Sequence, residues 1–190
     1  IDQAETWDAV TSRMVLPNGT ETDNIVLIAP ATNTALINPT LLAGRWLQPG
    51  DEDAIVINTD VLRLAPDVRV GQQLTLNIND KKTTWTVVGI IRSVLSGPSA
   101  YANYPYFSRL LGRFGQAAAV YVKITNPGLE YEQTIAKLLE SHFEQAGLKV
   151  ASTTTVSELR ITAIRQYNVI FIFLILMAFL LTIVGGLGLT

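Results

Sequence analysis

Residues that could do chemistry are few in this chain of 190 residues. Cysteine is absent, which excludes a thiolate zinc site and a cysteine nucleophile. His142 is the only histidine, so a Ser–His–Asp triad would need it as the base, and no pattern marks a nucleophilic serine. Its place on the apolar face of an expected helix favours a half-buried packing residue. We therefore predict no catalytic residue and no enzyme activity for the chain itself.

Two further patterns resemble ligand sites but do not fit them. Asp51-Glu52-Asp53 could hold calcium, yet it lacks the alternate ligands of a calcium loop, which favours a solvated turn. Gly185-Gly186-Leu187-Gly188 is not followed by Lys-Ser/Thr, so it is not a phosphate loop. The net charge of −2, with both signs interspersed, argues against nucleic acid as a partner. We predict no metal and no cofactor.

The most informative segment runs from Val169 to Leu189, which is 21 residues with no charge and one hydroxyl, that of Thr182. A helix of this length spans a bilayer core of about 30 Å, so the segment predicts a transmembrane helix. The alternative, a buried helix of a soluble core, is disfavoured in so short a chain. Small residues there, which are Gly185, Gly186 and Gly188, would let another membrane helix approach closely.

The stem before this segment carries a helix start signal. Thr155-Val156-Ser157-Glu158 is a capping box, with Thr155 as the N-cap and Glu158 reaching back to it. No Pro or Gly follows until Gly185, so one helix of about 50 Å is expected to begin at Val156 and enter the membrane. Thr155 and Glu158 would start a stiff lever, because no flexible tether interrupts it.

The residues before the stem show strand and turn patterns that predict an α+β outer part. Strands are expected at 7–16, 24–29, 54–58, 73–78, 83–90, 117–124 and 148–151, with turns at Asn18-Gly19 and at 79–82. Helices are expected at 59–64, at 105–112 and at 130–146, the last with an apolar stripe on one face.

Four aromatic residues gather between Ser93 and Arg113: Tyr101, Tyr104, Tyr106 and Phe107. They are either a recognition surface for a partner or the closure of a small core, and the core is the favoured interpretation.

The order of several short motifs resembles the periplasmic core of MacB-type ABC permeases. These motifs are Gly44-Arg45-Trp46, Asp51, Ala54-Ile55-Val56-Ile57-Asn58, Val70-Gly71-Gln72-Gln73-Leu74 and Thr86-Val87-Val88-Gly89-Ile90. The run from Phe173 through Met177-Ala178 to Gly185-Gly186-Leu187-Gly188 is similar to the second membrane helix of the FtsX-like permease domain. The resemblance covers nearly the whole chain from about residue 40 onward.

The resemblance implies a porter-like α+β layer with an inserted small, mostly-β subdomain, followed by a long stalk and transmembrane helix. By analogy, the porter-like part is 1–42 and 117–155, the inserted subdomain 43–116, the helical stalk 156–168 and the transmembrane helix 169–190. A first membrane helix would precede Ile1, and further ones would follow Thr190. The implied partners are an ATP-binding cassette ATPase subunit or domain, a second permease copy in a dimer, an extracytoplasmic adaptor, and membrane lipid.

The implied role is mechanotransmission. ATP-driven motion would pass along the stalk to a soluble part that stands outside the cytoplasmic (inner) membrane, for export or for handling of lipoproteins or peptides. One alternative keeps this topology and makes the chain an FtsX-like regulator of a cell-wall hydrolase. An alternative of another class is a single-pass, membrane-anchored sensor or enzyme.

Overall fold

The computed structural model describes residues 1–93, 96–113, 117–125 and 128–187, without the side chains of residues 163, 166, 169 and 183–187. The chain forms two compact units, Ile1–Lys123 and Ile124–Thr190. Both strands and helices are present, so the mixed α and β composition predicted from the sequence is confirmed. The predicted division into porter-like, inserted, stalk and membrane parts stays a prediction.

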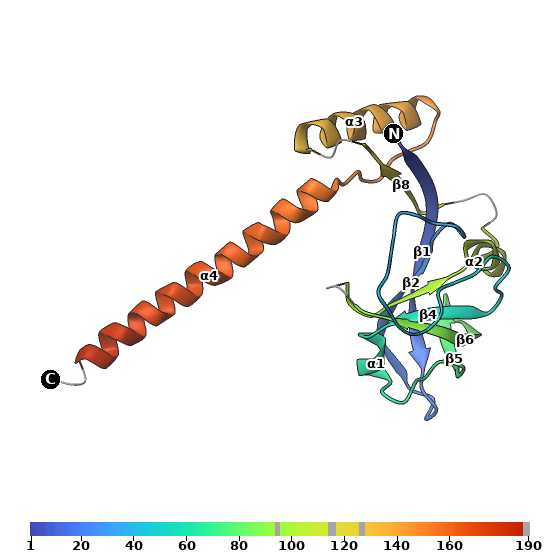
Figure 1. Ribbon diagram of the computed structural model, residues 1–190, viewed down its shortest axis with the longest axis horizontal. Coiled ribbons are helices and arrows are strands. Elements are labelled where there is room, and N and C mark those ends of the chain that lie inside the picture. Colours follow the sequence, from blue (N-terminus) through green and yellow to red (C-terminus); the bar gives the residue numbers. More distant parts are fainter. Residues whose placement is uncertain (94–95, 114–116, 126–127, 188–190) are drawn as a thin grey trace. The chain divides into compact units, whose positions relative to one another are not determined.

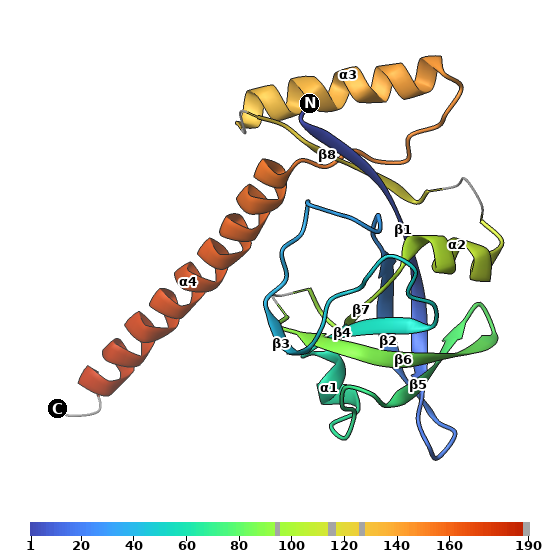
Figure 2. The same ribbon diagram turned by 45° about the vertical axis from the view of Figure 1, so that its right-hand side comes forward.

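The first unit is built on strands that pair in a closed ring (Figures 1 and 2). In ring order the strands are β1 (Gln3–Val15), β2 (Glu21–Ala29), β7 (Ser99–Ala102), β4 (Ala54–Asn58), β6 (Lys81–Ile91) and β5 (Gln73–Ile78), and β5 pairs back with β1. The pairs β2–β7 and β4–β6 are parallel, and the other pairs in the ring are antiparallel. Two strands pair outside the ring: β3 (Leu41–Gly44) with β6, and β8 (Ala119–Lys123) with the first part of β1.

The hydrophobic core fills this ring, since the strands turn alternate side chains inward. Leu74, Leu76 and Ile78 of β5 are buried, while the residues between them are more exposed. Every residue of β4 is buried. Two short helices, α1 (Val61–Leu64) and α2 (Tyr104–Leu111), add residues to the same core, as predicted for 59–64 and 105–112.

Both predicted hairpins are present, and one has a tighter turn than expected. The β1–β2 hairpin turns through Gly19, whose φ is +84°. The β5–β6 turn consists of Asn79 and Asp80 alone, with φ angles of +50° and +63°, which is a type I′ geometry. The prediction of a turn over 79–82 is therefore wrong for Lys81 and Lys82. They extend β6, because a type I′ turn needs only two central residues.

The second unit contains two helices, α3 (Leu129–Gln145) and α4 (Val156–Leu187). Gly147, with φ of +80°, ends α3 as a left-handed residue. The strand predicted at 148–151 is wrong, because these residues form no ladder with any described strand. The predicted packing of α3 is also not observed: none of its residues is buried, His142 is exposed, and Leu138 is 61% exposed.

The backbone of α4 is helical from Val156 to Leu187, and at about 1.5 Å per residue it is about 48 Å long (Figure 1). Within the residues whose side chains are described, no helix has both the length and the apolar composition that a bilayer crossing needs. The transmembrane helix predicted for 169–190 stays a prediction.

Two glycines let the chain cross itself closely where β3 meets β6. A Cβ on Gly89 would lie 2.1 Å from the backbone oxygen of Arg45, and a Cβ on Gly44 would lie 2.2 Å from that of Val88. Gly44 also has φ of +72°, which disfavours other residues. The Arg45 N–H donates to the Val88 carbonyl at 2.9 Å, so the crossing is held by a backbone hydrogen bond.

We expect Gly89→Ala to lower the free energy of unfolding by about 3 kcal/mol, because the added methyl group meets a backbone atom that cannot move aside as a side chain can. Urea denaturation followed by tryptophan fluorescence measures the change. Gly128→Ala is the matched control, since a Cβ there meets nothing within 4 Å and the φ of −172° suits any residue. The control should cost less than about 1 kcal/mol. Equal costs would show that the crossing is not tight.

Candidate functional site

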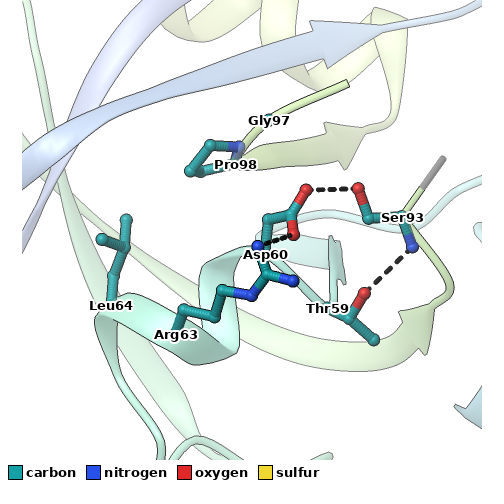
Figure 3. Close-up of a pocket in the computed structure, with 7 residues that line it drawn as sticks. All are labelled: Thr59, Asp60, Arg63, Leu64, Ser93, Gly97 and Pro98. Atoms are coloured by element: carbon teal, nitrogen blue, oxygen red, sulfur yellow. Dashed lines mark hydrogen bonds and ion pairs between the residues drawn. The ribbon is translucent and has the colours of Figure 1, made fainter. Parts of the chain in front are cut away.

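The first unit has a cavity of about 480 Å³ beside α1 (Figure 3). Ser93 Oγ donates to the Asp60 carboxylate, and Thr59 Oγ1 accepts from the Ser93 N–H at 3.0 Å. Arg63 forms an ion pair with Asp60 at 3.1 Å. The residues that line the cavity are Thr59, Asp60, Arg63, Leu64, Ser93, Gly97 and Pro98.

The polar groups of this cavity serve the fold. Asn58, which is buried and precedes Thr59 in the chain, donates from Nδ2 to the Gly97 carbonyl at 2.7 Å and accepts from the N–H groups of Val61 and Ser99 at 3.2 Å. A serine nucleophile needs a neighbouring base, and the only histidine of the chain does not line this cavity. The arrangement therefore shows how the end of β4 is tied to the start of β7 and carries no catalytic assignment.

The acidic turn at 51–53 is held by arginines. Asp51 accepts two hydrogen bonds from the guanidinium of Arg45, at 2.7 and 2.8 Å, and Glu52 pairs with Arg109 of α2 at 2.5 Å. The hydrogen bonds from Arg45 lower the pKa of Asp51 despite its partial burial. Among the described residues, no three His, Asp or Glu side chains gather as a metal site would require. Asp51 thus links the turn to Arg45, which lies at the crossing of Gly44 and Gly89.

The four candidate aromatic residues are divided between two hydrophobic clusters. Phe107 is fully buried in the core, where Tyr104 and Tyr106 pack partly buried against the same cluster. Tyr106 meets Trp85 edge-on, with ring centroids 5.4 Å apart. Tyr101 belongs to a second cluster, beside Trp46. The favoured interpretation, closure of a core, is confirmed for Phe107, and a partner surface at the other three stays a prediction.

The start of α4 has the geometry that its sequence predicts. The Glu158 N–H donates to Thr155 Oγ1 at 3.2 Å, and the Thr155 N–H donates to Glu158 Oε2 at 3.0 Å. These are the two reciprocal bonds of a capping box, so that feature is confirmed. The hydrogen bond from the Thr155 backbone is the main cause that lowers the pKa of Glu158. The mechanical role predicted for this pair stays a prediction.

Two residues of α3 add bonds to the same helix start. Glu132 accepts from the Ser157 N–H at 2.9 Å and from Ser157 Oγ at 2.8 Å. Gln133 Nε2 donates to Glu158 Oε1 at 3.1 Å. We call these four residues, with Thr155, the α3–α4 joint. The Ser157 N–H is the main cause that lowers the pKa of Glu132. An anionic group there also complements the positive end of the α4 dipole.

Sequence reasoning identified Thr155 and Glu158 of this joint and missed Glu132, Gln133 and Ser157. The capping box is a local signal over four residues, whereas Glu132 lies 25 residues before Ser157. A weak signal was present, since α3 begins with two acidic residues, Glu130 and Glu132, in its first turn. Nothing in the sequence distinguishes the one that reaches another helix.

The far half of α4 exposes an unbroken apolar surface. The large apolar side chains from Ile170 to Leu181 are 45–69% exposed on every side of the helix. Thr182 Oγ1 is the only side-chain hydroxyl between Val169 and Leu189. It donates to the Ala178 carbonyl at 2.8 Å, so the helix itself satisfies that donor. Gly185 and Gly186 lie in the helical backbone, and Gly188 lies outside the described residues. Their close packing against another helix stays a prediction.

Comparison with known proteins supports the fold. No family model matches the chain. No curated protein matches it either. Among solved structures, the periplasmic region of MacB from Actinobacillus actinomycetemcomitans is similar, with a TM-score of 0.54 and 17% identity over 78% of this chain and 69% of that one.

A second solved structure has the same degree of likeness. It is the extracellular domain of the noncanonical ABC-type transporter YknZ from Gram-positive bacteria, with a TM-score of 0.54 and 12% identity over 76% of this chain and 77% of that one. Identities this low establish a shared fold and leave function to be argued from the molecule. The predicted resemblance to the MacB periplasmic core is thereby confirmed at the level of the fold.

Asp51→Asn should lower the free energy of unfolding at pH 7 by about 1.5–3 kcal/mol, because the charged acceptor of hydrogen bonds from Arg45 and from the Gln48 N–H is lost. The pKa of Asp51 is lowered from its ordinary value of 3.8, so its contribution is complete above that value and is lost as the pH falls through the lowered pKa. Urea denaturation at pH 7 and pH 3 should show the difference between wild type and variant shrinking at acid pH.

Glu52→Gln is the control for this turn, since Glu52 and Arg109 are 66% and 46% exposed at their side chains. An exposed pair contributes about 0–1 kcal/mol, so the control should differ little from wild type at either pH. A loss in Asp51→Asn no larger than in the control would contradict the role given to Asp51.

Proposed function

We propose that this chain is the extracytoplasmic domain of an ABC-type permease, together with the helix that transmits ATP-driven motion to it. The observation that carries the proposal is the fold shared with the MacB periplasmic region and the YknZ extracellular domain. The partners proposed on this basis are an ATP-binding cassette ATPase and a second permease copy. The soluble part lies outside the cytoplasmic membrane in this proposal.

The apolar half of α4 supports a location at a membrane. A helix that is apolar on all sides is stable only when other apolar matter surrounds it, in a large core or in lipid. The run from Val169 to Leu189 has no charge, and Thr182 needs no water for its donor. We propose that this half of α4 lies in the bilayer, and that Gly185, Gly186 and Gly188 face a neighbouring helix.

The polar half of α4 supports transmission. Its first turn is closed by the capping box, and no Pro or Gly interrupts the helix before Gly185. An unbroken helix passes a displacement at one end to the other end, whereas a flexible linker absorbs it. In this proposal residues 156–168 form the stalk. The porter-like part is 1–42 with 117–155, and 43–116 is inserted into it.

Insertion of Gly-Gly between Arg160 and Ile161 tests transmission in the complete permease with its ATPase. The 190 residues contain no cysteine, so with any cysteines elsewhere in the permease and its ATPase replaced by serine, Asp67→Cys gives one spin-label site in each copy. We expect ATP to change the distance between the two labels in the otherwise unmodified permease. In the insertion variant ATP hydrolysis should continue and that change should disappear, because the inserted glycines make the stem flexible.

The same Gly-Gly insertion after Gly19, in the exposed β1–β2 turn, is the control and should leave the ATP-driven distance change intact. Persistence of that change in the stem variant would contradict transmission through α4. No ATP-driven change in the unmodified permease would count against the proposed function itself.

A further inference from the structure

We propose that Glu132 is the positioning residue that makes α3 and α4 one mechanical unit, so that α3 turns with α4. This deepens the proposed function and rests on it for its biological meaning. The carboxylate projects from the first turn of α3 and holds the first turn of α4 through Ser157.

The geometry of the contact fixes direction as well as distance. Glu132 Oε2 accepts from the Ser157 N–H, and Glu132 Oε1 accepts from Ser157 Oγ, so each carboxylate oxygen has its own donor on one residue. Paired bonds to a planar carboxylate restrict rotation about the contact, which a single bond does not. Next to them, Gln133 bonds Glu158. Two consecutive residues of α3 therefore hold two consecutive residues of α4.

The backbone connection alone does not explain a fixed angle between the helices. Residues 146–155 join α3 to α4 and contain neither helix nor strand. Such a segment limits how far two helices separate and leaves their angle free. Within the described part of this unit, the side-chain bonds between the helices come from Glu132 and Gln133. The angle is therefore set at the α3–α4 joint.

The coupling is separable from the folding of α4. The capping box uses Thr155 and Glu158, which both belong to the start of α4, and its two bonds do not involve Glu132. Removal of the Glu132 carboxylate leaves these bonds in place. A variant at Glu132 therefore removes the acceptor of the Ser157 N–H and the link between the helices, while α4 keeps the two capping-box bonds.

Acid provides an independent readout. The groups that face Glu132 are Ser157, Thr155 and Arg160 of the α4 segment, and those that face Glu158 are Thr155 and Gln133. The hydrogen bonds from Ser157 lower the pKa of Glu132 from its ordinary 4.5. The joint is therefore complete above pH 4.5 and is lost as the pH falls through that lowered pKa.

The test measures the distance between α3 and α4 in the whole chain, reconstituted in phosphatidylcholine nanodiscs. The pair Glu144→Cys and Asn168→Cys places one spin label on each helix at exposed positions. We expect one narrow distance distribution at pH 7, which broadens as the pH falls through the lowered pKa of Glu132. With Glu132→Ala added, the distribution should be broad at pH 7 and in acid, and circular dichroism should show unchanged helix content.

Two further variants keep the result interpretable. Glu130→Gln removes the other acid of the same helical turn and should leave the distribution narrow. Ser157→Ala removes one of the two bonds with a residue that favours helix, and should give an intermediate width. A narrow distribution in Glu132→Ala at pH 7 would overturn the proposal. That measurement needs no ATPase, so its failure would leave the proposed function standing. Conversely, a failure of ATP-driven transmission would leave the α3–α4 distance measurement valid.

Discussion

The apolar surface of α4 is the main constraint on the environment in which this chain is stable. From Ile170 to Leu181 the large apolar side chains are about half exposed or more. Covering one such side chain is worth about 1.5–3 kcal/mol, so a run of this length outweighs the 5–15 kcal/mol that typically holds a whole domain together. Water is therefore a poor environment for this helix. In the proposed function lipid covers it, which suits an uncharged helix whose Thr182 hydroxyl is satisfied within the helix.

The opposite end of the same helix is polar, so the two ends of α4 suit different surroundings. Its first N–H groups are satisfied by Thr155 and Glu132, both of which place oxygen atoms at the positive end of the helix dipole. In the proposed function the apolar half is anchored in lipid and the hydrogen-bonded start is joined to α3, as transmission of motion along the helix requires. The closed strand ring of the first unit has a buried core and the tight Gly44–Gly89 crossing, which are features of a rigidly packed body.

Local signals in the sequence predicted local structure well. They did not predict which strands and side chains pair across long stretches of the chain. The capping box, the β1–β2 hairpin and α2 each depend on residues a few positions apart, and all are present. The closure of the ring depends on the parallel pairing of β2 with β7, whose residues Val26 and Ser99 lie far apart in the chain. The apolar stripe of α3 showed that the helix is amphipathic, but periodicity does not reveal whether anything covers the stripe. For the same reason Glu132 could not be paired with Ser157 from sequence alone.

Protection of α4 from a water-soluble reagent tests most directly whether the apolar half of this helix lies in a bilayer. The whole chain in nanodiscs, carrying either Ile175→Cys or Thr162→Cys, is exposed to a charged, water-soluble maleimide, and the extent of labelling is read by mass spectrometry. We predict rapid labelling at 162 and protection at 175, with protection lost when the lipid is replaced by urea. Equal labelling of the two positions in nanodiscs, or a chain that stays monomeric in water without lipid or detergent, would contradict it.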